Sequence, residues 1–340
     1  MQKFYTLAPE QQARHFHDLA RQAIKHWGIE NASISLIKHR ENAVFSVIDH
    51  ASEQRYALRV HRFGYHSDAS LRSELQWMQA LTEAGVATPP IIPTLAGDLF
   101  INVMSDSIPQ PHQCDLLGWV EGDPLGSIDS EHAASPDRIV DNYRVVGNLA
   151  GRLHNQSQEW QLPEGFTRAS WDVDGLIGND PLWGRFWELE PLTNAQRELL
   201  HRARDKAEQQ LRTFGQGADL YGLIHNDFLP ENLLLTADGI RIIDFDDAGF
   251  GWHLFEFATS LFFHLDEPYF DAALAAMIEG YREVRELPEE QLAMLPTFFL
   301  VRGLVYLGWV HTRKDTDTAK AVTPELIEGV IALVTDYLDQ

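Results

Sequence analysis

The stretch 223–249 restricts the possible folds of this chain more than any other part of it. It reads LIHNDFLPENLLLTADGIRIIDFDDAG, with two apolar runs at residues 233–235 and 240–243. Between the runs lies Asp238-Gly239, a dipeptide typical of tight turns between antiparallel strands. The sequence therefore predicts a β-hairpin, in which the second strand returns the chain to the place where the first strand began.

Polar residues stand at both open ends of the predicted hairpin. They are His225, Asp227 and Asn232 before the first strand, and Asp244, Asp246 and Asp247 after the second. Because a hairpin brings its open ends together, we expect these side chains to gather in one place. Carboxylate and amide oxygens are hard ligands that suit Mg²⁺ bound together with a phosphate group. An ordinary turn could explain one His-x-Asp with a nearby Asn, but it does not explain both groups flanking one hairpin.

The spacing of these residues resembles that of the protein-kinase fold. Protein kinases carry H-R-D-x-x-x-x-N followed by D-F-G. Here Asp227 and Asn232 keep the same five-residue step, and D-F-D at 244–246 stands in place of D-F-G. The whole pattern is similar to that of the aminoglycoside phosphotransferase and choline kinase-like family, which includes homoserine kinases and a bacterial stress-response kinase. The resemblance implies an α+β, bilobal protein-kinase-like fold, with an N-terminal antiparallel β-sheet lobe that contains a helix and a mainly helical C-terminal lobe.

Apolar periodicity elsewhere in the chain fits this organisation. The expected strands are 33–38, 43–49, 56–61, 99–103 and 114–119. The expected helices are 9–27, 67–84, 136–157, 194–214, 252–264, 268–282, 288–311 and 324–338. A polar turn containing Pro109 and Pro111 would join the last two strands, and Gly249-Phe250-Gly251 would form a flexible turn. The break at 120–124 predicts a nucleotide-binding lobe over 1–121, and a catalytic and acceptor-binding lobe over 122–340.

The resemblance implies ATP and Mg²⁺ as cofactors and assigns roles around the hairpin. Asp227 would be the catalytic residue, accepting the proton of the acceptor hydroxyl or orienting that hydroxyl. Asn232 and Asp244 would hold Mg²⁺ on the phosphates. Asp246 would be a second metal contact or would face the acceptor, and Asp247 could do either.

Two further residues are expected to support this loop. His225 would stabilise it by hydrogen bonding, since Asp227 already fills the role of proton acceptor. Glu256 is the one acid within the apolar segment 252–264. A buried acid requires hydrogen-bond partners, and in the family an acid at this place braces the catalytic loop.

The N-terminal lobe would bind the nucleotide. Tyr-Ala-Leu-Arg-Val at 56–60 resembles the third-strand motif V-A-I-K, with Arg59 in the place of the lysine. A guanidinium can pair with phosphates as a planar fork. The alternative is that Arg59 lies on an edge strand and faces solvent. Glu74 would pair with Arg59 or would be a solvated helix carboxylate. Arg40 and the amides near Asn42 would contact phosphate or would form a plain turn.

The same lobe would hold the adenine ring. The resemblance places the hinge at Leu117, Trp119 and Val120, where backbone N–H and C=O groups would bind the base. Backbone recognition leaves no mark in a sequence, so this assignment depends on the resemblance alone.

Composition limits the partners. The net charge is −23 (27 Lys and Arg against 50 Asp and Glu), and an acidic surface repels nucleic acid and anionic membranes. A cationic acceptor would be attracted, although solubility also explains the charge. The single Cys114 excludes an intrachain disulfide. With no signal-peptide core in the first 30 residues and no long uncharged apolar run, we expect a cytoplasmic protein.

Three functions follow from these observations. The first is a kinase that moves the γ-phosphate of ATP to a hydroxyl of a small molecule, such as an amino alcohol, an amino acid or an aminoglycoside. The second is a Ser/Thr protein kinase of the bacterial stress-response type, although the few residues between Asp244 and the next helix leave little room for an activation segment. The third is a non-catalytic nucleotide-binding module. Arg59 and the missing glycines are its only support, and the intact Asp227, Asn232 and Asp244 argue against it. The oligomeric state stays open.

Overall fold

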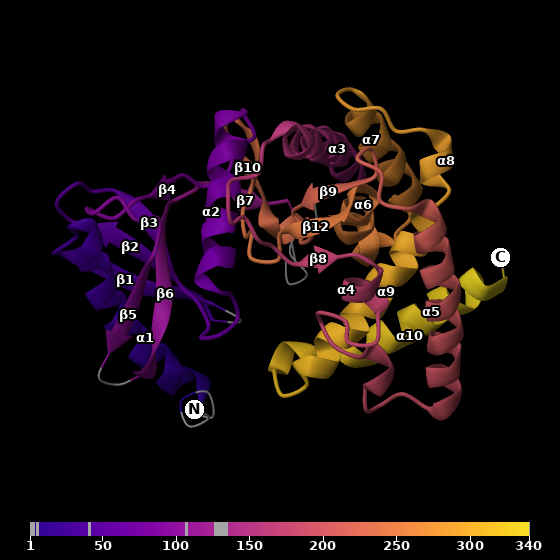
Figure 1. Ribbon diagram of the computed structural model, residues 1–340, viewed down its shortest axis with the longest axis horizontal. Helices are drawn as coiled ribbons and strands as arrows, with labels where there is room; N and C mark the ends of the chain where they lie inside the picture. The colour runs from indigo at the N-terminus through magenta and orange to yellow at the C-terminus, as the bar shows by residue number, and fades with distance from the viewer. Residues whose placement is uncertain (1–3, 5–6, 40–41, 106–107, 126–134, 340) are drawn as a thin grey trace. The chain divides into compact units, whose positions relative to one another are not determined.

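The computed structural model of the chain describes residue 4 and residues 7–39, 42–105, 108–125 and 135–339 (Figure 1). The chain folds into two compact units. The first unit comprises Met1–Asp123, Gln161–Thr167 and Thr236–Ile243, and the second comprises Pro124–Trp160, Arg168–Leu235 and Asp244–Gln340. The first unit therefore extends beyond the predicted lobe 1–121 by taking two short later segments. Arg40 lies outside the described residues.

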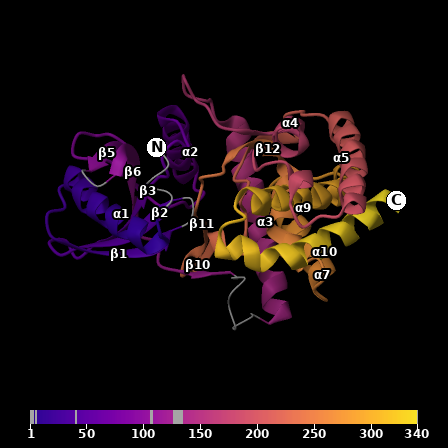
Figure 2. The same cartoon turned by 90° about the horizontal axis from the view of Figure 1, so that it is seen from below.

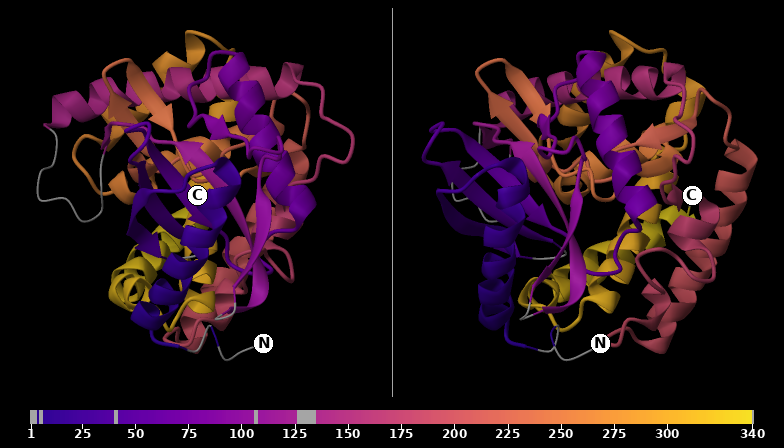
Figure 3. Two further views of the ribbon diagram at one scale, coloured as in Figure 1. Left: turned by 90° about the vertical axis from the view of Figure 1, so that its left-hand side faces the viewer. Right: turned by 60° about the vertical axis from the view of Figure 1, so that its left-hand side comes forward.

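The first unit is built on an antiparallel sheet. Its strand order is β1 (Ala32–His39), β2 (Ala43–Asp49), β3 (Arg55–Val60), β6 (Ile108–Gly118) and β4 (Ile91–Ile92), with β5 (Ile101–Ser105) also paired to β6. Helix α1 (Pro9–Ala23) and the 3₁₀ turn η1 (Ile24–Trp27) cover one face of the sheet (Figure 3). The core between them is apolar and includes Phe16, Phe45 and Leu58. Helix α2 (Asp68–Glu83) follows β3, and its first turn is capped by the Ser67 hydroxyl.

The second unit is mainly helical. Its helices are α3 (Pro136–Glu159), α4 (Val173–Ile177), α5 (Asn194–Phe214), α6 (His253–Leu261), α7 (Phe270–Arg282), α8 (Glu289–Leu292), α9 (Leu295–Thr312) and α10 (Asp317–Asp339). Helix α10 lies against α9 and α5 (Figure 2). Helices α3 and α7 approach closely because Gly147 and Gly280 lie where the two helices meet, and a Cβ on either glycine would overlap the backbone of the other helix.

A small sheet in the second unit carries the segments that lead to the predicted site. Strand β12 (Gly249–Trp252) lies between β8 (Ser170–Trp171) and β9 (Tyr221–Ile224), parallel to β8 and antiparallel to β9. Strand β9 ends directly before His225. The D-F-D sequence comes shortly before β12 in the chain. Because β9 and β12 are paired, the loop that begins at His225 and the D-F-D segment lie close together.

The predicted hairpin is present. Strands β10 (Leu233–Thr236) and β11 (Gly239–Ile242) are neighbours in a three-stranded sheet with β7 (Asp123–Pro124). Gly239 has φ 119°, a conformation that favours glycine. The turn is held by the Thr236 hydroxyl, which donates to Gly239 O at 2.9 Å and accepts from the Asp238 N–H at 3.2 Å.

Three local predictions were wrong. Pro109 and Pro111 lie inside β6 and not in a turn; both are exposed, next to the irregularity in the β5–β6 pairing where the ladder needs no N–H from them. Gly249–Gly251 is part of strand β12 and not a flexible turn. Glycine suits both positions because a Cβ at either one would meet neighbouring atoms of β8 or β9. Helix α10 starts at Asp317 and continues through Pro324.

One stretch of the described chain, Glu289–Thr312, is apolar and long enough to cross a membrane by length and composition alone. Within its most apolar window, 78% is buried inside the protein. A helix that is apolar on all sides is typical of a protein core as well as of a membrane span. In this structure it forms the centre of the second unit.

Candidate active site

The loop after β9 brings Asp227 and Asn232 together. Asn232 ends the 3₁₀ turn η3 (Pro230–Asn232), and its Nδ2 donates to the Asp227 carboxylate at 2.7 Å and to the Asp227 carbonyl at 2.9 Å. The Asp227 side chain keeps 19% of its surface exposed. An amide that uses its NH₂ group on two acceptors keeps its carbonyl oxygen for a cation. The local geometry therefore suits one proton acceptor beside one metal ligand.

Glu256 holds this loop from α6. Its Oε1 accepts the backbone N–H groups of His225 at 2.5 Å and of Asn226 at 3.2 Å. Burial raises the pKa of Glu256 to about 8, against the opposing effect of these hydrogen bonds and of Arg302. At neutral pH burial thus favours the protonated acid, while the two N–H groups that Oε1 accepts favour the carboxylate.

The D-F-D segment contacts the same loop. Asp244 is exposed and has φ 65°, a left-handed conformation that is uncommon outside glycine and is better tolerated by Asp and Asn. The Phe245 ring is fully buried and packs edge-on against the His225 ring, with centroids 4.6 Å apart. This ring contact joins the two predicted motifs. It assigns His225 a packing role beside its hydrogen bond to the Asp227 N–H at 3.3 Å.

Arg168 fixes the other end of the D-F-D segment. Its guanidinium is buried and donates to the carbonyls of Phe245 at 3.2 Å and Ala248 at 2.6 Å, and to that of Asp246. The Asp246 side chain is itself buried. Sequence reasoning did not single out Arg168, because backbone carbonyls as partners leave no pattern in a sequence.

In the first unit, Arg59 lies in a buried ion cluster. Its Nη1 donates to Glu74 at 2.8 Å, as the resemblance implied, and its Nε and Nη2 bind Asp115 at 2.9 and 3.0 Å. Asp115 also contacts His61 Nε2 at 2.6 Å. Burial by itself would raise the pKa of Asp115, but Arg59 and His61 outweigh it and hold that pKa below its ordinary value.

Asp115 explains why an arginine suits this position. It lies directly opposite Arg59 in the β3–β6 register. A guanidinium can bind Asp115 with two N–H groups and still reach Glu74, whereas a lysine ammonium is a single point charge. The solvent-facing alternative for Arg59 is wrong, since its side chain is only 7% exposed.

The predicted hinge is partly engaged in the sheet. Leu117 pairs with Ala57 on one side and Ile91 on the other. The Trp119 N–H donates to Arg55 O at 3.3 Å, and the Arg55 guanidinium lies 3.5 Å from the centre of the Trp119 ring. Among the described residues of this segment, Val120 has the backbone least engaged in such bonds.

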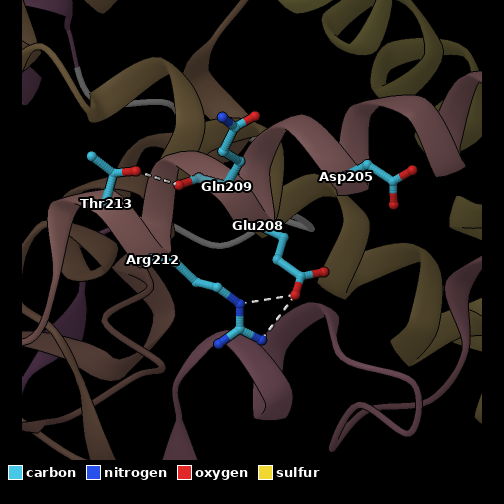
Figure 4. Close-up of a pocket in the computed structure, with 5 residues that line it drawn as sticks. All are labelled: Asp205, Glu208, Gln209, Arg212 and Thr213. Carbon is cyan, nitrogen blue, oxygen red and sulfur yellow. Dashed lines mark hydrogen bonds and ion pairs between the residues drawn. The ribbon is translucent and has the colours of Figure 1, made fainter.

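A shallow surface hollow lies elsewhere in the second unit (Figure 4). Its lining residues are Asp205, Glu208, Gln209, Arg212 and Thr213, all on α5. Four of them interact in pairs, with Arg212 bound to Glu208 at 2.8 Å and the Thr213 hydroxyl donating to Gln209 O at 2.8 Å. None of the predicted site residues lines this hollow.

The phosphotransferase enzyme family matches residues 33–291. The chain belongs to this family. A solved microcompartment-associated aminopropanol kinase is similar over 95% of this chain and 98% of its own, with 34% identity and a TM-score of 0.83. This chain is therefore an enzyme, a kinase. Its fold is the protein-kinase-like α+β fold that the sequence predicted.

Two more distant relatives of this chain are also kinases. Amicoumacin kinase of Bacillus subtilis (strain 168) is 20% identical over 332 residues, which cover 93% of this chain and 90% of the relative. The solved structure of amicoumacin kinase hAmiN, in complex with AMP-PNP, Ca²⁺ and Ami, is 18% identical with a TM-score of 0.73 and covers 96% of this chain and 94% of its own. At this identity the structural likeness shows the fold.

Proposed function

We propose that this phosphotransferase moves the γ-phosphate of Mg-ATP to the hydroxyl of a small amino alcohol. The observation that carries the proposal is the arrangement at Asp227, a partly exposed carboxylate bound by Asn232 and joined to the D-F-D segment through His225 and Phe245. Phosphoryl transfer needs mainly positioning and charge neutralisation, and these residues supply the positioning.

Each group has a role in this proposal. Asp227 orients the acceptor hydroxyl and accepts its proton as the hydroxyl oxygen bonds to the γ-phosphorus and the bond from that phosphorus to the departing ADP oxygen breaks. Asn232 Oδ1 and the exposed Asp244 carboxylate are hard oxygen donors that fit Mg²⁺. When bound, the ion would neutralise charge on the phosphates. In the first unit, Arg59 with Glu74 would face the phosphates, and the hinge at Val120 would contact adenine.

The chemistry around Asp227 favours an acceptor with a positive charge. Burial raises the pKa of Tyr306 to about 12, and the nearby carboxylates of Asp227 and Glu231 add to that increase. Asp227 and Glu231 therefore lie near this phenol, while the Arg302 guanidinium, which donates to the Tyr306 hydroxyl at 2.9 Å, opposes their effect on its pKa. The Phe263 ring is 45% exposed with its centroid 4.9 Å from that of Tyr306, and an aromatic face attracts an ammonium group. The 34% identical aminopropanol kinase supports the same class of acceptor.

The test is an acceptor panel with radiolabelled Mg-ATP. It contains 1-amino-2-propanol, ethanolamine and choline, with 1,2-propanediol as the matched neutral alcohol. We expect labelled phosphate on an amino alcohol and at least tenfold less on the diol. Label on the protein itself would favour the protein-kinase alternative, and equal rates with the diol would refute the cationic acceptor.

Two variants test the residue roles. Asp227→Asn keeps the shape of the side chain and removes its charge, and it should lower kcat by a factor of at least about 100, or about 3 kcal/mol. Asp244→Ala should abolish the protection by Mg-ATP against thermal unfolding. Parental activity in the first variant, or retained protection in the second, would refute the corresponding role.

A further inference from the structure

Arg302 is a charged residue in an apolar helix. It is the one charged residue among 295–310, and its side chain is 0% exposed. Burying a guanidinium is costly unless it is paired and hydrogen-bonded. A core helix gains nothing from such a residue by packing alone, so the partners of Arg302 indicate what it does.

The polar partners of Arg302 belong to the loop that carries Asp227. Nη1 donates to the carbonyl of Asn226 at 3.2 Å, and Nη2 lies 3.5 Å from Asp227 Oδ1. Nη2 also donates to the Tyr306 hydroxyl at 2.9 Å, one turn further along α9. The guanidinium therefore faces the Asp227 loop and is held in place by its own helix.

Aromatic rings enclose the same guanidinium. Its carbon lies 4.3 Å from the ring centre of Tyr306, 5.1 Å from that of Trp183 and 5.4 Å from that of Phe255. Cation–π attraction stabilises a positive charge in such surroundings. Because the rings come from different parts of the second unit, they restrict the positions that Arg302 can occupy.

We propose that Arg302 is a positioning residue, which fixes the Asp227 carboxylate in the orientation required for phosphoryl transfer. Asn232 binds Oδ2 at 2.7 Å while Arg302 lies at Oδ1, so both carboxylate oxygens are constrained. The backbone of Asn226 is constrained too, since Glu256 binds its N–H and Arg302 its carbonyl. These bonds hold Asn226 at a φ of 66°, a left-handed conformation that is uncommon outside glycine and that Asn tolerates better than most residues. The inference rests on the proposed function for the role of Asp227.

The first experiment compares kcat with nucleotide binding. A misplacement of about 1 Å can cost about 100-fold in rate, so Arg302→Met should lower kcat by that order. The KM for Mg-ATP should stay within about twofold, and Mg-ATP should still protect against thermal unfolding. Arg302→Lys should restore part of kcat. The control is Arg197→Met, because Arg197 also donates to backbone carbonyls, those of Trp187 and Leu189, and should leave kcat unchanged.

The second experiment asks whether Arg302 acts through Asp227. Residues that act as a unit have strongly non-additive effects on catalysis. Adding Arg302→Met to Asp227→Asn should lower the residual rate by less than about threefold. A full additional loss of about 100-fold would overturn the proposal, as would an unchanged kcat in Arg302→Met.

Folding and acceptor identity are controlled separately. If Arg302→Met does not fold, Tyr306→Phe takes its place, because this variant removes the hydroxyl that holds Arg302 Nη2 and keeps the ring. Tyr306→Phe should lower kcat several-fold. An unchanged kcat would assign Arg302 a purely structural role. If the panel contains no acceptor, the amino-alcohol proposal fails. The positioning role of Arg302 is then tested by comparing the same variants in Mg-ATP hydrolysis, where Asp227 would orient a water molecule in place of the acceptor hydroxyl. Equal hydrolysis by parental enzyme and Arg302→Met would overturn the positioning role.

Discussion

Replacing Glu256 by glutamine or alanine separates its charge from its hydrogen bonds. Glu256→Gln keeps an acceptor oxygen for the N–H groups of His225 and Asn226, and it mimics the protonated acid. Glu256→Ala leaves two buried donors without a partner, at about 1–3 kcal/mol each. We expect alanine to lower the free energy of unfolding by about 2–6 kcal/mol and to reduce activity strongly. Glutamine should preserve activity within a few-fold at pH 7.

The pH dependence gives a sharper test. The pKa of Glu256 is raised from 4.5 in the unfolded chain to about 8 in the folded protein. Its stabilising contribution is therefore complete below about pH 4.5 and is lost as the pH rises through about 8. Each pH unit between these limits corresponds to about 1.4 kcal/mol. The parental protein should thus lose about 4 kcal/mol relative to Glu256→Gln between pH 5 and pH 8.

Urea unfolding of both proteins at pH 5, 6, 7 and 8 measures this difference. The comparison cancels the titration of groups that do not interact with Glu256, because the two proteins differ at one side chain. A constant difference in the free energy of unfolding across this range would show that Glu256 does not change its charge there.

Three further predictions concern stability, measured by urea unfolding. The rings of His154 and His253 stack with their centroids 4.3 Å apart, and burial lowers both pKa values, that of His253 to about 3. The free energy of unfolding should therefore fall below about pH 6.5, and His253→Phe should remove about 2 kcal/mol of the loss between pH 7 and pH 5. Asp115→Asn breaks a buried pair with Arg59 and should cost about 3–5 kcal/mol; an unchanged midpoint would contradict this. Asn226→Gly should cost less than Asn226→Ala by about 1 kcal/mol, because φ is 66°; equal costs would argue against strain at this position.

Local chemistry was sufficient for much of the fold. The Asp238-Gly239 turn and the Thr193 cap at the start of α5 both act over a few neighbouring residues. The five-residue step from Asp227 to Asn232 is also local, because η3 folds the chain back so that the two side chains meet. Such features are predictable, since the residues that cause them are adjacent in the sequence.

The partners of the buried charges were decided by tertiary structure. Asp115 meets Arg59 only through the β3–β6 register, 56 residues away, and Arg302 meets Asp227 across 75 residues. Arg168 binds carbonyls about 80 residues downstream. A sequence shows that a charge is present, but the free energy of burying it depends on which distant groups the packing brings to it. For that reason the sequence by itself could name Asp227, while only the folded chain showed what holds it.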